Sequence, residues 1–451
     1  MTPPSAAAAA VAAAGARAPR RRRPPRPPSR ARTLMGPLRR RPVDLIVSAL
    51  IVVALVIAGA AVWYFSSARR TTLVPATVSP VAPPYPVDVP ARLIHRWTAE
   101  SEATRSPQVT DTAVLTGHDG AVRARDPRTG RAIWGYERPL PICGLLAAWS
   151  PTTPTALAAY ANSRGCSEIT ALDAHRGVRR GTRSSDADNP VVLQSDGGYV
   201  LSLGRTRAET WGSNLVRGIE YGRIDARVKP DMGRHDGHDC RLTSGMTAGD
   251  RVALVEHCAG DPGFRLTVIG ALLDKDEKIP LYGSAVITSG TAFAAPVVVG
   301  MSESGIAVYD GGANSPEPTA PAIRTFTSDG VETGRHPVPG GPALPAGAVS
   351  VNSDGLVSVW TGHDTVVLDA AALRPRFTVP ATSGPGVAVG GRMLVPDPAG
   401  YTVVDAATGR RVGALPVVRD LGQTPSVPIV PAVIGDAVVE QRGNLIVAYG
   451  P

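Results

Sequence analysis

Lysine and aromatic residues are scarce in this 451-residue chain. Aromatic residues make up 5% of it, and lysine occurs only at Lys229, Lys275 and Lys278. Arginine, alanine, valine and glycine are abundant instead, which indicates a GC-rich bacterial genome. Acidic residues are absent from residues 1–42, which hold eleven of the 47 basic residues, so 36 basic residues remain beside 38 acidic ones. The rest of the chain is therefore near neutral, and its net charge does not predict nucleic-acid binding by the folded part.

Large apolar side chains are nearly missing from residues 1–42, which consist mainly of Ala, Pro and Arg. Such a segment cannot bury enough surface to offset its ordering entropy, so we expect a disordered tail. Its arginines could attract anionic lipid or nucleic acid, or could only set membrane topology. The lack of interleaved aromatic residues argues against nucleic acid.

The only long apolar run is residues 43–65, which contain a single charged side chain, Asp44. A helix of about 20 residues spans the hydrocarbon core of a bilayer, so the run predicts one transmembrane helix. Trp63 and Tyr64 lie at its far end, and the arginine-rich tail precedes it, so we expect the N-terminus in the cytoplasm and the C-terminal part outside. A cleaved signal peptide is the alternative, although its apolar region is usually only about 7–15 residues long.

Helical periodicity is lacking in the rest of the chain. Residues 66–91 are rich in Pro, Val, Ser and Thr, which is typical of an extended spacer. From residue 92 to 451, short runs of Val, Leu, Ile and Ala alternate with turns of Gly, Asp, Asn and Thr. This pattern predicts an all-β sandwich, barrel or propeller.

Internal repeats distinguish among these architectures. Two clear copies, residues 113–137 and 393–415, each contain strands separated by a glycine turn and by an Asp-x-x-Thr-Gly turn. The repeat residues are Asp126, Thr129, Gly130 and Trp134 in the first copy, and Asp405, Thr408 and Gly409 in the second.

Weaker copies occur at residues 168–181, 218–228, 302–312 and 355–378. We predict that the turn aspartates of these copies are Asp126, Asp173, Asp225, Asp310, Asp369 and Asp405. The longest interval between them predicts one further unit, with strands at 251–257 and 264–273.

This repeat resembles the pyrroloquinoline-quinone-like (PQQ-like) β-propeller repeat. The resemblance covers roughly residues 92–450 and implies four-stranded antiparallel blades, which often number eight in this family. We therefore predict eight blades, with seven as the alternative. Residues 92–100 read as a lone outer strand, with Trp97 in the position of Trp134, and 436–450 supply two more strands. Joining these two segments would close the ring and remove an exposed sheet edge.

The four cysteines are Cys143, Cys166, Cys240 and Cys258. Each neighbouring pair falls within one expected blade, so we predict the disulfides Cys143–Cys166 and Cys240–Cys258 in a domain outside the cytoplasm. Free buried thiols are the alternative.

Catalytic and metal-binding motifs are not evident. There is no G-x-S-x-G sequence, and no Ser, His and Asp form a recognisable set. The densest group of soft ligands is His235, His238, Cys240, His257 and Cys258, but its spacing matches no zinc pattern and disulfides would consume both sulfurs. We predict no catalytic, cofactor-binding or metal-binding residues.

Quinoproteins of this superfamily clamp their cofactor between a tryptophan and a disulfide of two adjacent cysteines, and this chain has no Cys-Cys pair. Trp97, Trp134 and Trp360 are interpreted as packing between blades. A family member is a scaffolding lipoprotein in outer-membrane protein assembly. We therefore expect a membrane-anchored, extracytoplasmic interaction or scaffolding module with a protein partner in the bacterial cell envelope. The alternatives are an envelope dehydrogenase or hydrolase with its site in the central channel, and a sensor. No small-molecule ligand can be named.

Overall fold

The computed structural model describes residues 42–86, 88–224, 240–289, 294–312, 319–419 and 427–451. The chain divides into two compact units, Met1–Phe65 and Ser66–Pro451. In the first unit the structure describes one helix, α1 (Pro42–Phe65), with every residue exposed and a mean hydropathy of 3.0 in its most apolar window. This helix is long and apolar enough to cross a membrane. The expected disordered tail lies outside the described residues except for Pro42.

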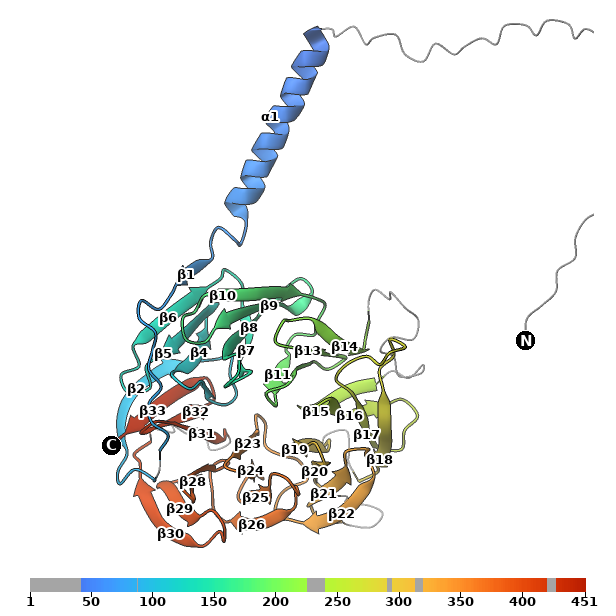
Figure 1. Cartoon of the computed structure of the whole chain (residues 1–451). Helices are drawn as coiled ribbons and strands as arrows, with labels where there is room; N and C mark the ends of the chain where they lie inside the picture. Colours follow the sequence, from blue (N-terminus) through green and yellow to red (C-terminus); the bar gives the residue numbers. More distant parts are fainter. Residues whose placement is uncertain (1–41, 87, 225–239, 290–293, 313–318, 420–426) are drawn as a thin grey trace, which may run out of the picture. The chain divides into compact units, whose positions relative to one another are not determined.

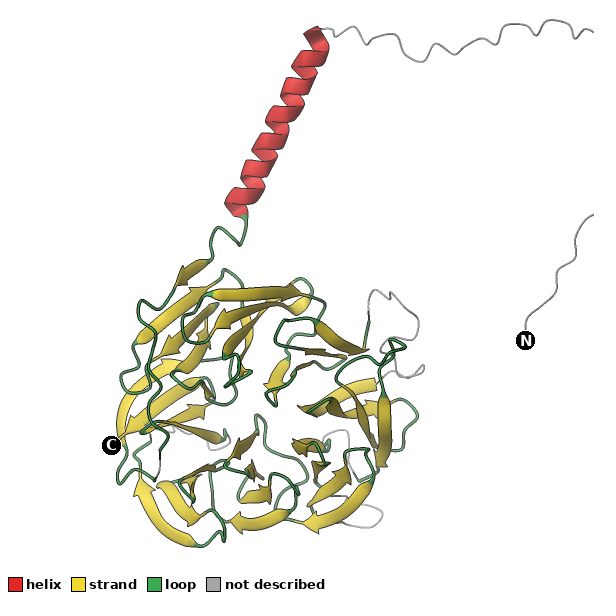
Figure 2. Ribbon diagram, viewed as in Figure 1, coloured by secondary structure: helices red, strands yellow, loops and turns green. Residues whose placement is uncertain are grey.

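The second unit is a ring of eight antiparallel sheets, so the predicted eight-bladed, all-β propeller is confirmed and seven blades is wrong (Figures 1 and 2). The strands of blades 1 to 4 are β3 (Gln108–Val109), β4 (Val114–His118), β5 (Ala121–Arg125) and β6 (Ala132–Glu137); β7 (Ile142–Ala148), β8 (Thr155–Asn162), β9 (Gly165–Asp173) and β10 (Arg179–Ser184); β11 (Val192–Ser195), β12 (Val200–Leu203), β13 (Arg207–Trp211) and β14 (Arg217–Gly222); and β15 (Cys240–Ala248), β16 (Arg251–Cys258), β17 (Phe264–Gly270) and β18 (Leu281–Ile287).

The strands of blades 5 to 8 are β19 (Val297–Ser302), β20 (Gly305–Asp310), β21 (Ala322–Thr327) and β22 (Glu332–Pro337); β23 (Ser350–Ser353), β24 (Leu356–Trp360), β25 (Thr365–Asp369) and β26 (Pro375–Val379); β27 (Val387–Val389), β28 (Arg392–Asp397), β29 (Gly400–Asp405) and β30 (Arg411–Pro416); and β31 (Ile429–Ile434), β32 (Ala437–Arg442), β33 (Leu445–Gly450) and β2 (Ile94–Glu100). In each blade the first strand lies toward the centre of the ring and the fourth at its rim (Figure 1).

Blade 8 closes the ring by combining strands from both ends of the folded unit. Three strands come from its C-terminal part, and the outer strand β2 pairs with β33, with Ile94 opposite Gly450 and Trp97 opposite Ala448. The predicted closure is therefore confirmed. β2 covers the edge of β33 that would otherwise be open, and it ties the first strand of the ring to its last blade.

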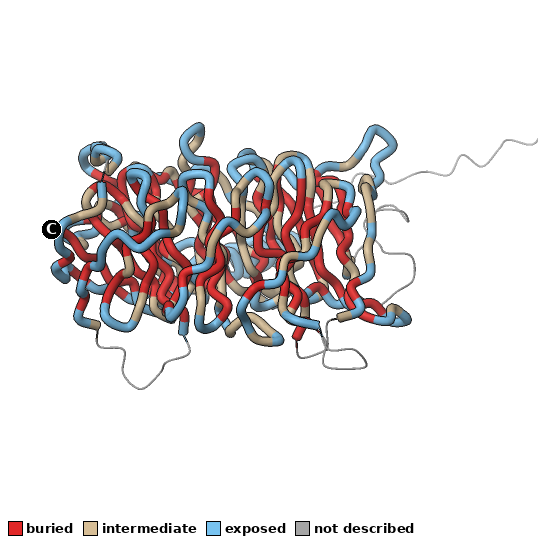
Figure 3. Tube along the Cα trace, turned by 90° about the horizontal axis from the view of Figure 1, so that it is seen from below, coloured by how far each residue is buried: buried red, intermediate tan, exposed pale blue. Residues whose placement is uncertain are grey.

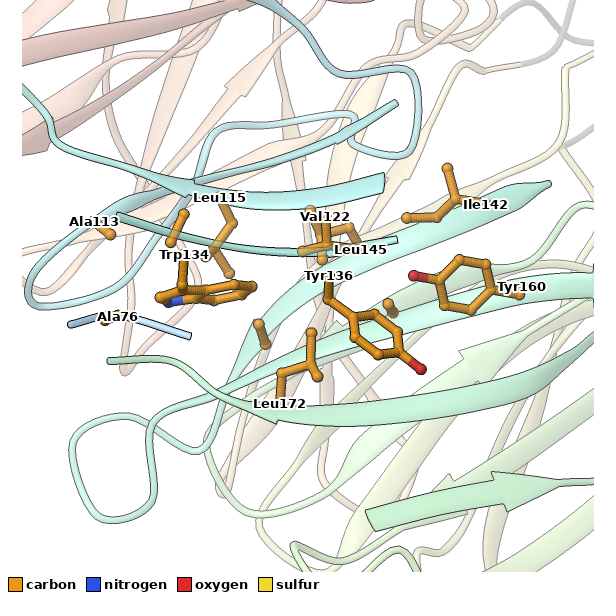
Figure 4. Close-up of a cluster of buried hydrophobic side chains, with 13 residues drawn as sticks. Ala76, Ala113, Leu115, Val122, Trp134, Tyr136, Ile142, Leu145, Tyr160 and Leu172 are labelled. Atoms are coloured by element: carbon orange, nitrogen blue, oxygen red, sulfur yellow. The ribbon is translucent and has the colours of Figure 1, made fainter. Parts of the chain in front are cut away.

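The hydrophobic core lies between neighbouring blades rather than in one central cluster. Figure 3 shows the propeller edge-on, with buried residues along the strands and exposed residues at the turns on both faces. Between blades 1 and 2, the side chains of Trp134, Tyr136, Tyr160 and Leu172 pack together (Figure 4). Each blade therefore buries its apolar side chains against the faces of the two neighbouring blades.

The expected spacer, residues 66–91, is not wholly free of the propeller. Its segment β1 (Thr72–Val74) pairs antiparallel with β6 and forms a fifth strand at the rim of blade 1. Ala76, two residues later, is buried in the core between blades 1 and 2. Thr and Val have high β propensity, so these residues suit a strand although prolines follow them.

Two of the weaker repeat copies are out of phase with the blades. The segment 218–228 begins in the outer strand β14 instead of before a turn, and Asp225 lies outside the described residues. Asp310 ends the second strand of blade 5, where its buried carboxylate binds Arg324 and Arg335. The turn that joins the last two strands of that blade is instead Thr327–Val331.

Candidate functional site

The repeated Asp-x-x-Thr-Gly turns are organised by their aspartate side chains. Oδ1 of Asp126 accepts hydrogen bonds from the backbone N–H and the hydroxyl of Thr129, both at 2.8 Å. Asp405 accepts the same two bonds from Thr408, at 2.9 and 2.7 Å. The first turn ends at Gly130, which has a φ of 70°. This left-handed conformation is unfavourable for residues that have a Cβ atom. These motif residues therefore shape turns and contact no candidate substrate site.

An aromatic ring on the outer strand of one blade lies against the turn glycine of the next. Trp97 covers Gly130, Trp134 covers Gly177 and Phe377 covers Gly409. The indole nitrogen of Trp134 also donates to the carbonyl oxygen of Ala174 at 2.8 Å. Phe377 was missed by the sequence analysis, although it stands third in its strand, as Trp134 does.

Trp360 is the third tryptophan predicted to pack between blades. Its indole nitrogen donates to the carbonyl oxygen of Thr382 at 3.1 Å. Thr382 lies in the connection that leads from β26 to β27. Tryptophan at these positions therefore combines a buried ring with a satisfied N–H group, which is a packing role.

A strap, here residues 75–86 and 88–93, crosses one face of the propeller after β1. Ala76 donates its N–H to the carbonyl of Arg176 in blade 2, and Pro83 lies against Gly435 in blade 8. Further along, Asp88 lies 3.6 Å from the guanidinium of Arg392 in blade 7. These contacts belong to turns between strands 1 and 2 or strands 3 and 4, which lie on the same face of an antiparallel blade.

A cavity of about 330 Å³ lies beside the strap. The first strands of blades 1, 6, 7 and 8 (β3, β23, β27 and β31) line it, together with Tyr85 and Pro86 of the strap. Its walls are mostly Val, Ala and Pro, and Asp354 is the one charged side chain among the described residues that line it. The cavity therefore suits an uncharged or apolar group with a hydroxyl or amide donor.

Tyr85 connects the strap to this cavity. Its hydroxyl donates to Oδ1 of Asp354 at 2.7 Å, while the side chain remains 68% exposed. This hydrogen bond, reinforced by partial burial and by the carboxylate charge, raises the pKa of Tyr85. Neither residue is recognisable as part of a site from the sequence, because only the fold brings them together.

Both predicted disulfides are present. Cys240 and Cys258 are direct partners on the adjacent strands β15 and β16, with a Cα–Cα distance of 4.0 Å. Cys143 and Cys166 lie on the first and third strands of blade 2, with a Cα–Cα distance of 6.1 Å. Both residues lie within one blade, as predicted, but not on neighbouring strands, so this bond passes the end of β8. The described residues contain no free cysteine.

The group of soft ligands does not assemble as a metal site. His235 and His238 lie outside the described residues, and the ring of His257 lies tilted against that of Phe264, with the ring centres 5.2 Å apart. The structure instead brings the carboxylate of Glu256 near the two sulfurs of the Cys240–Cys258 bond. Tyr221 and Thr267 already donate hydrogen bonds to this buried carboxylate, and disulfide sulfurs are not thiolate ligands.

Several arginine–carboxylate networks are buried among the blades. Glu440 on β32 is fully buried and pairs with Arg419, which follows β30 of blade 7, at 2.8 Å. Arg442 of the same strand also binds Glu440. Arg419 additionally donates to the carbonyl oxygens of Asp397 and Gly400. Since every charge has a partner and Arg419 is nearly inaccessible, this network fixes neighbouring blades and is not available to a ligand.

The ring of eight sheets, seven with four strands and one with the added strand β1, and the aspartate-capped turns define an eight-bladed β-propeller. No protein-family model matches the chain. No curated protein matches it either. Among solved structures, it is similar to the crystal structure of BamB from Moraxella catarrhalis, with 12% sequence identity and a TM-score of 0.47. The similarity covers 80% of this chain and 98% of the other chain, and it is distant.

Proposed function

We propose that this chain is a membrane-anchored, extracytoplasmic propeller that binds a partner protein of the bacterial cell envelope. The observation that carries the proposal is that the propeller already binds an extended segment of its own chain. That segment adds strand β1 to blade 1 and then continues as the strap beside the cavity. A rim edge and a turn-lined face that accept one extended peptide are suited to another.

The anchor and its orientation are part of this proposal. The exposed apolar helix α1 has the length of a membrane span, and the arginine-rich segment before it favours a cytoplasmic N-terminus. Two disulfides in the second unit support an oxidising compartment for the propeller. From the Asp-x-x-Thr-Gly repeat and the eight blades, we also propose that the chain is one of the PQQ-like propeller proteins that act without a cofactor.

The partner segment that best fits the cavity is extended, rich in small apolar residues and proline, and without acidic side chains. The strap provides the template, since Pro83 and Pro86 restrict the backbone and Tyr85 supplies a hydroxyl to Asp354. An acidic segment would place a second negative charge near Asp354, and the described lining residues include no basic side chain to offset it. This role needs no catalytic group, cofactor or nucleic acid.

Site-specific photocrosslinking in intact cells tests the proposal. A photoreactive amino acid at Asn352, an exposed cavity residue on β23, should yield a crosslink to one protein of defined mass. The matched control is Val216, which is 62% exposed in a turn of blade 3 on the same face. Crosslinks that are absent at Asn352, or identical at both positions, would contradict the proposal. A quinone absorption band in the purified protein would instead favour the dehydrogenase alternative.

A further inference from the structure

One outer strand of the propeller differs from all the others in charge. Seven of the eight fourth strands contain at least one charged side chain: β2, β6, β10, β14, β22, β26 and β30. The exception is β18 of blade 4, whose sequence LYGSAVI has neither a charged residue nor a proline. Charged residues and prolines are the usual means by which a sheet edge avoids pairing with another chain.

The side chains of β18 are accessible as well as uncharged. Leu281 is 66% exposed, Val286 is 36% exposed, and Ser284 between them is also exposed. Within the part of the chain that the structure describes, the backbone of β18 pairs with β17 and with no other strand. Its outward N–H and C=O groups therefore form an open row at the rim.

A bulge does not explain why β18 lacks charges. The pairing of β17 with β18 shifts register between Val268 and Ile269. The third and fourth strands of every other blade show a corresponding shift. The twist that a bulge introduces is therefore common to all eight blades, and the other seven also contain charges.

Blade 1 shows that a rim edge of this propeller accepts another strand. β1 lies antiparallel along β6, with Thr72 opposite Glu137 and Val74 opposite Gly135. This added strand has only uncharged side chains. The edge of β18 offers a longer run, seven residues, without the carboxylate that ends β6.

We propose that β18 is a homodimer interface, in which the β18 edges of two copies of this chain pair antiparallel and join the two blades 4 into one continuous sheet. Self-pairing of β18 sets only uncharged side chains opposite one another. Self-pairing of β10, by contrast, would bring Arg179, Arg180 and Arg183 of two copies together, and like charges across a strand pair are destabilising. The interface goes beyond the proposed partner binding and does not depend on it.

Sedimentation velocity of the full-length protein in detergent, over a range of concentrations, tests this interface. The native protein should dimerise, and Val286→Lys should raise the dimer dissociation constant about tenfold or more, since it would bring two lysines into the interface. Val412→Lys on β30 is the matched control, because Val412 is 39% exposed on a rim strand that already contains Arg411. The control should dimerise like the native protein.

A second variant makes the test independent of how Val286→Lys folds. Ser284→Cys, near the middle of β18, should be crosslinked to a dimer by a short bismaleimide, whereas Ser184→Cys at the end of β10 should not. A protein that remains monomeric at every soluble concentration overturns the proposal. So does a dimer that Val286→Lys leaves unchanged, or one that crosslinks equally at both cysteines.

Discussion

The indole of Trp97 lies directly against Gly130, so the strand that closes the ring also packs on the first repeat turn. A Cβ atom at Gly130 would lie 2.6 Å from Cγ of Trp97. The Trp97 indole nitrogen also donates to the carbonyl oxygen of Pro127 at 3.0 Å, in the same turn. Ring closure is thus secured by side-chain packing on the neighbouring blade as well as by the β2–β33 ladder.

Gly130→Ala should therefore destabilise the propeller more than its backbone conformation explains. A left-handed alanine costs about 1–2 kcal/mol, and crowding against Trp97 should add about 1–3 kcal/mol. Gly347→Ala is the control, because Gly347 has a similar φ of 76° and a Cβ atom there would meet no other atom within 4 Å. Chemical denaturation of both full-length variants in detergent measures the difference, and equal losses would show that the Trp97 contact is unimportant.

Glu440→Gln should be strongly destabilising. The substitution leaves Arg419 buried without its carboxylate partner, and breaking a buried pair in this way costs about 3–5 kcal/mol. Asp436→Asn, in the same blade as Glu440, removes an exposed ion pair with Arg128 of blade 1 and should cost less than about 1 kcal/mol. Unfolding midpoints in denaturant compare the two variants. Similar small losses would mean that water or another group compensates Arg419.

Peptide mass mapping with and without reduction should find Cys143–Cys166 and Cys240–Cys258 in protein isolated from membranes. Replacing Cys240 and Cys258 together by alanine should lower stability by about 2–4 kcal/mol, because the closed loop no longer restricts the unfolded chain. Four free thiols in the native protein would contradict both the pairing and the proposed location outside the cytoplasm.

Stability should fall in acid because of aspartates whose pKa is depressed in the folded state. Burial alone would raise the pKa of Asp188, but hydrogen bonds from the N–H and hydroxyl of Thr206 and from the N–H of Arg207 hold it below its usual value. The hydroxyl of Thr408 likewise lowers the pKa of Asp405. This stabilisation is present above the ordinary aspartate pKa of about 4 and is lost as the pH falls through the lowered values.

Thr206→Val tests this pH dependence at one site. Loss of the hydroxyl should raise the pKa of Asp188, so that part of the acid-sensitive stabilisation is lost at neutral pH. The smaller remaining loss should still begin near the unchanged pKa of the unfolded state and should be complete at a higher pH than in the native protein. Unfolding midpoints between about pH 3 and pH 7, chosen to bracket the ordinary pKa, would show the change. Parallel profiles for the native and variant proteins would exclude a role for this hydrogen bond in acid stability.

The sequence predicted the architecture because the propeller repeats local information. Asp126 and Asp405 cap their own turns within a few residues, so their motifs are readable without the fold. The strap was not predictable in this way. Tyr85 and Asp354 are far apart in the chain, and a proline-rich spacer has the same composition whether it is free or docked.

The same reasoning explains the two misplaced repeat copies. Asp310 follows a strand, as a turn aspartate would, but its partners Arg324 and Arg335 come from later strands. A short strand followed by Asp and Gly does not reveal which strand of a blade it is. Only the pairing between strands shows which position in the blade each strand occupies.

Closure through β2 also affects how the protein is made. β2 leaves the ribosome early, but its partner β33 is synthesised last of all the strands, after every other blade. At roughly 5–20 residues per second, β2 waits for tens of seconds without its strand partner. During this interval the nascent chain is open to proteases and chaperones, and a premature stop codon that removes β33 would leave it permanently so.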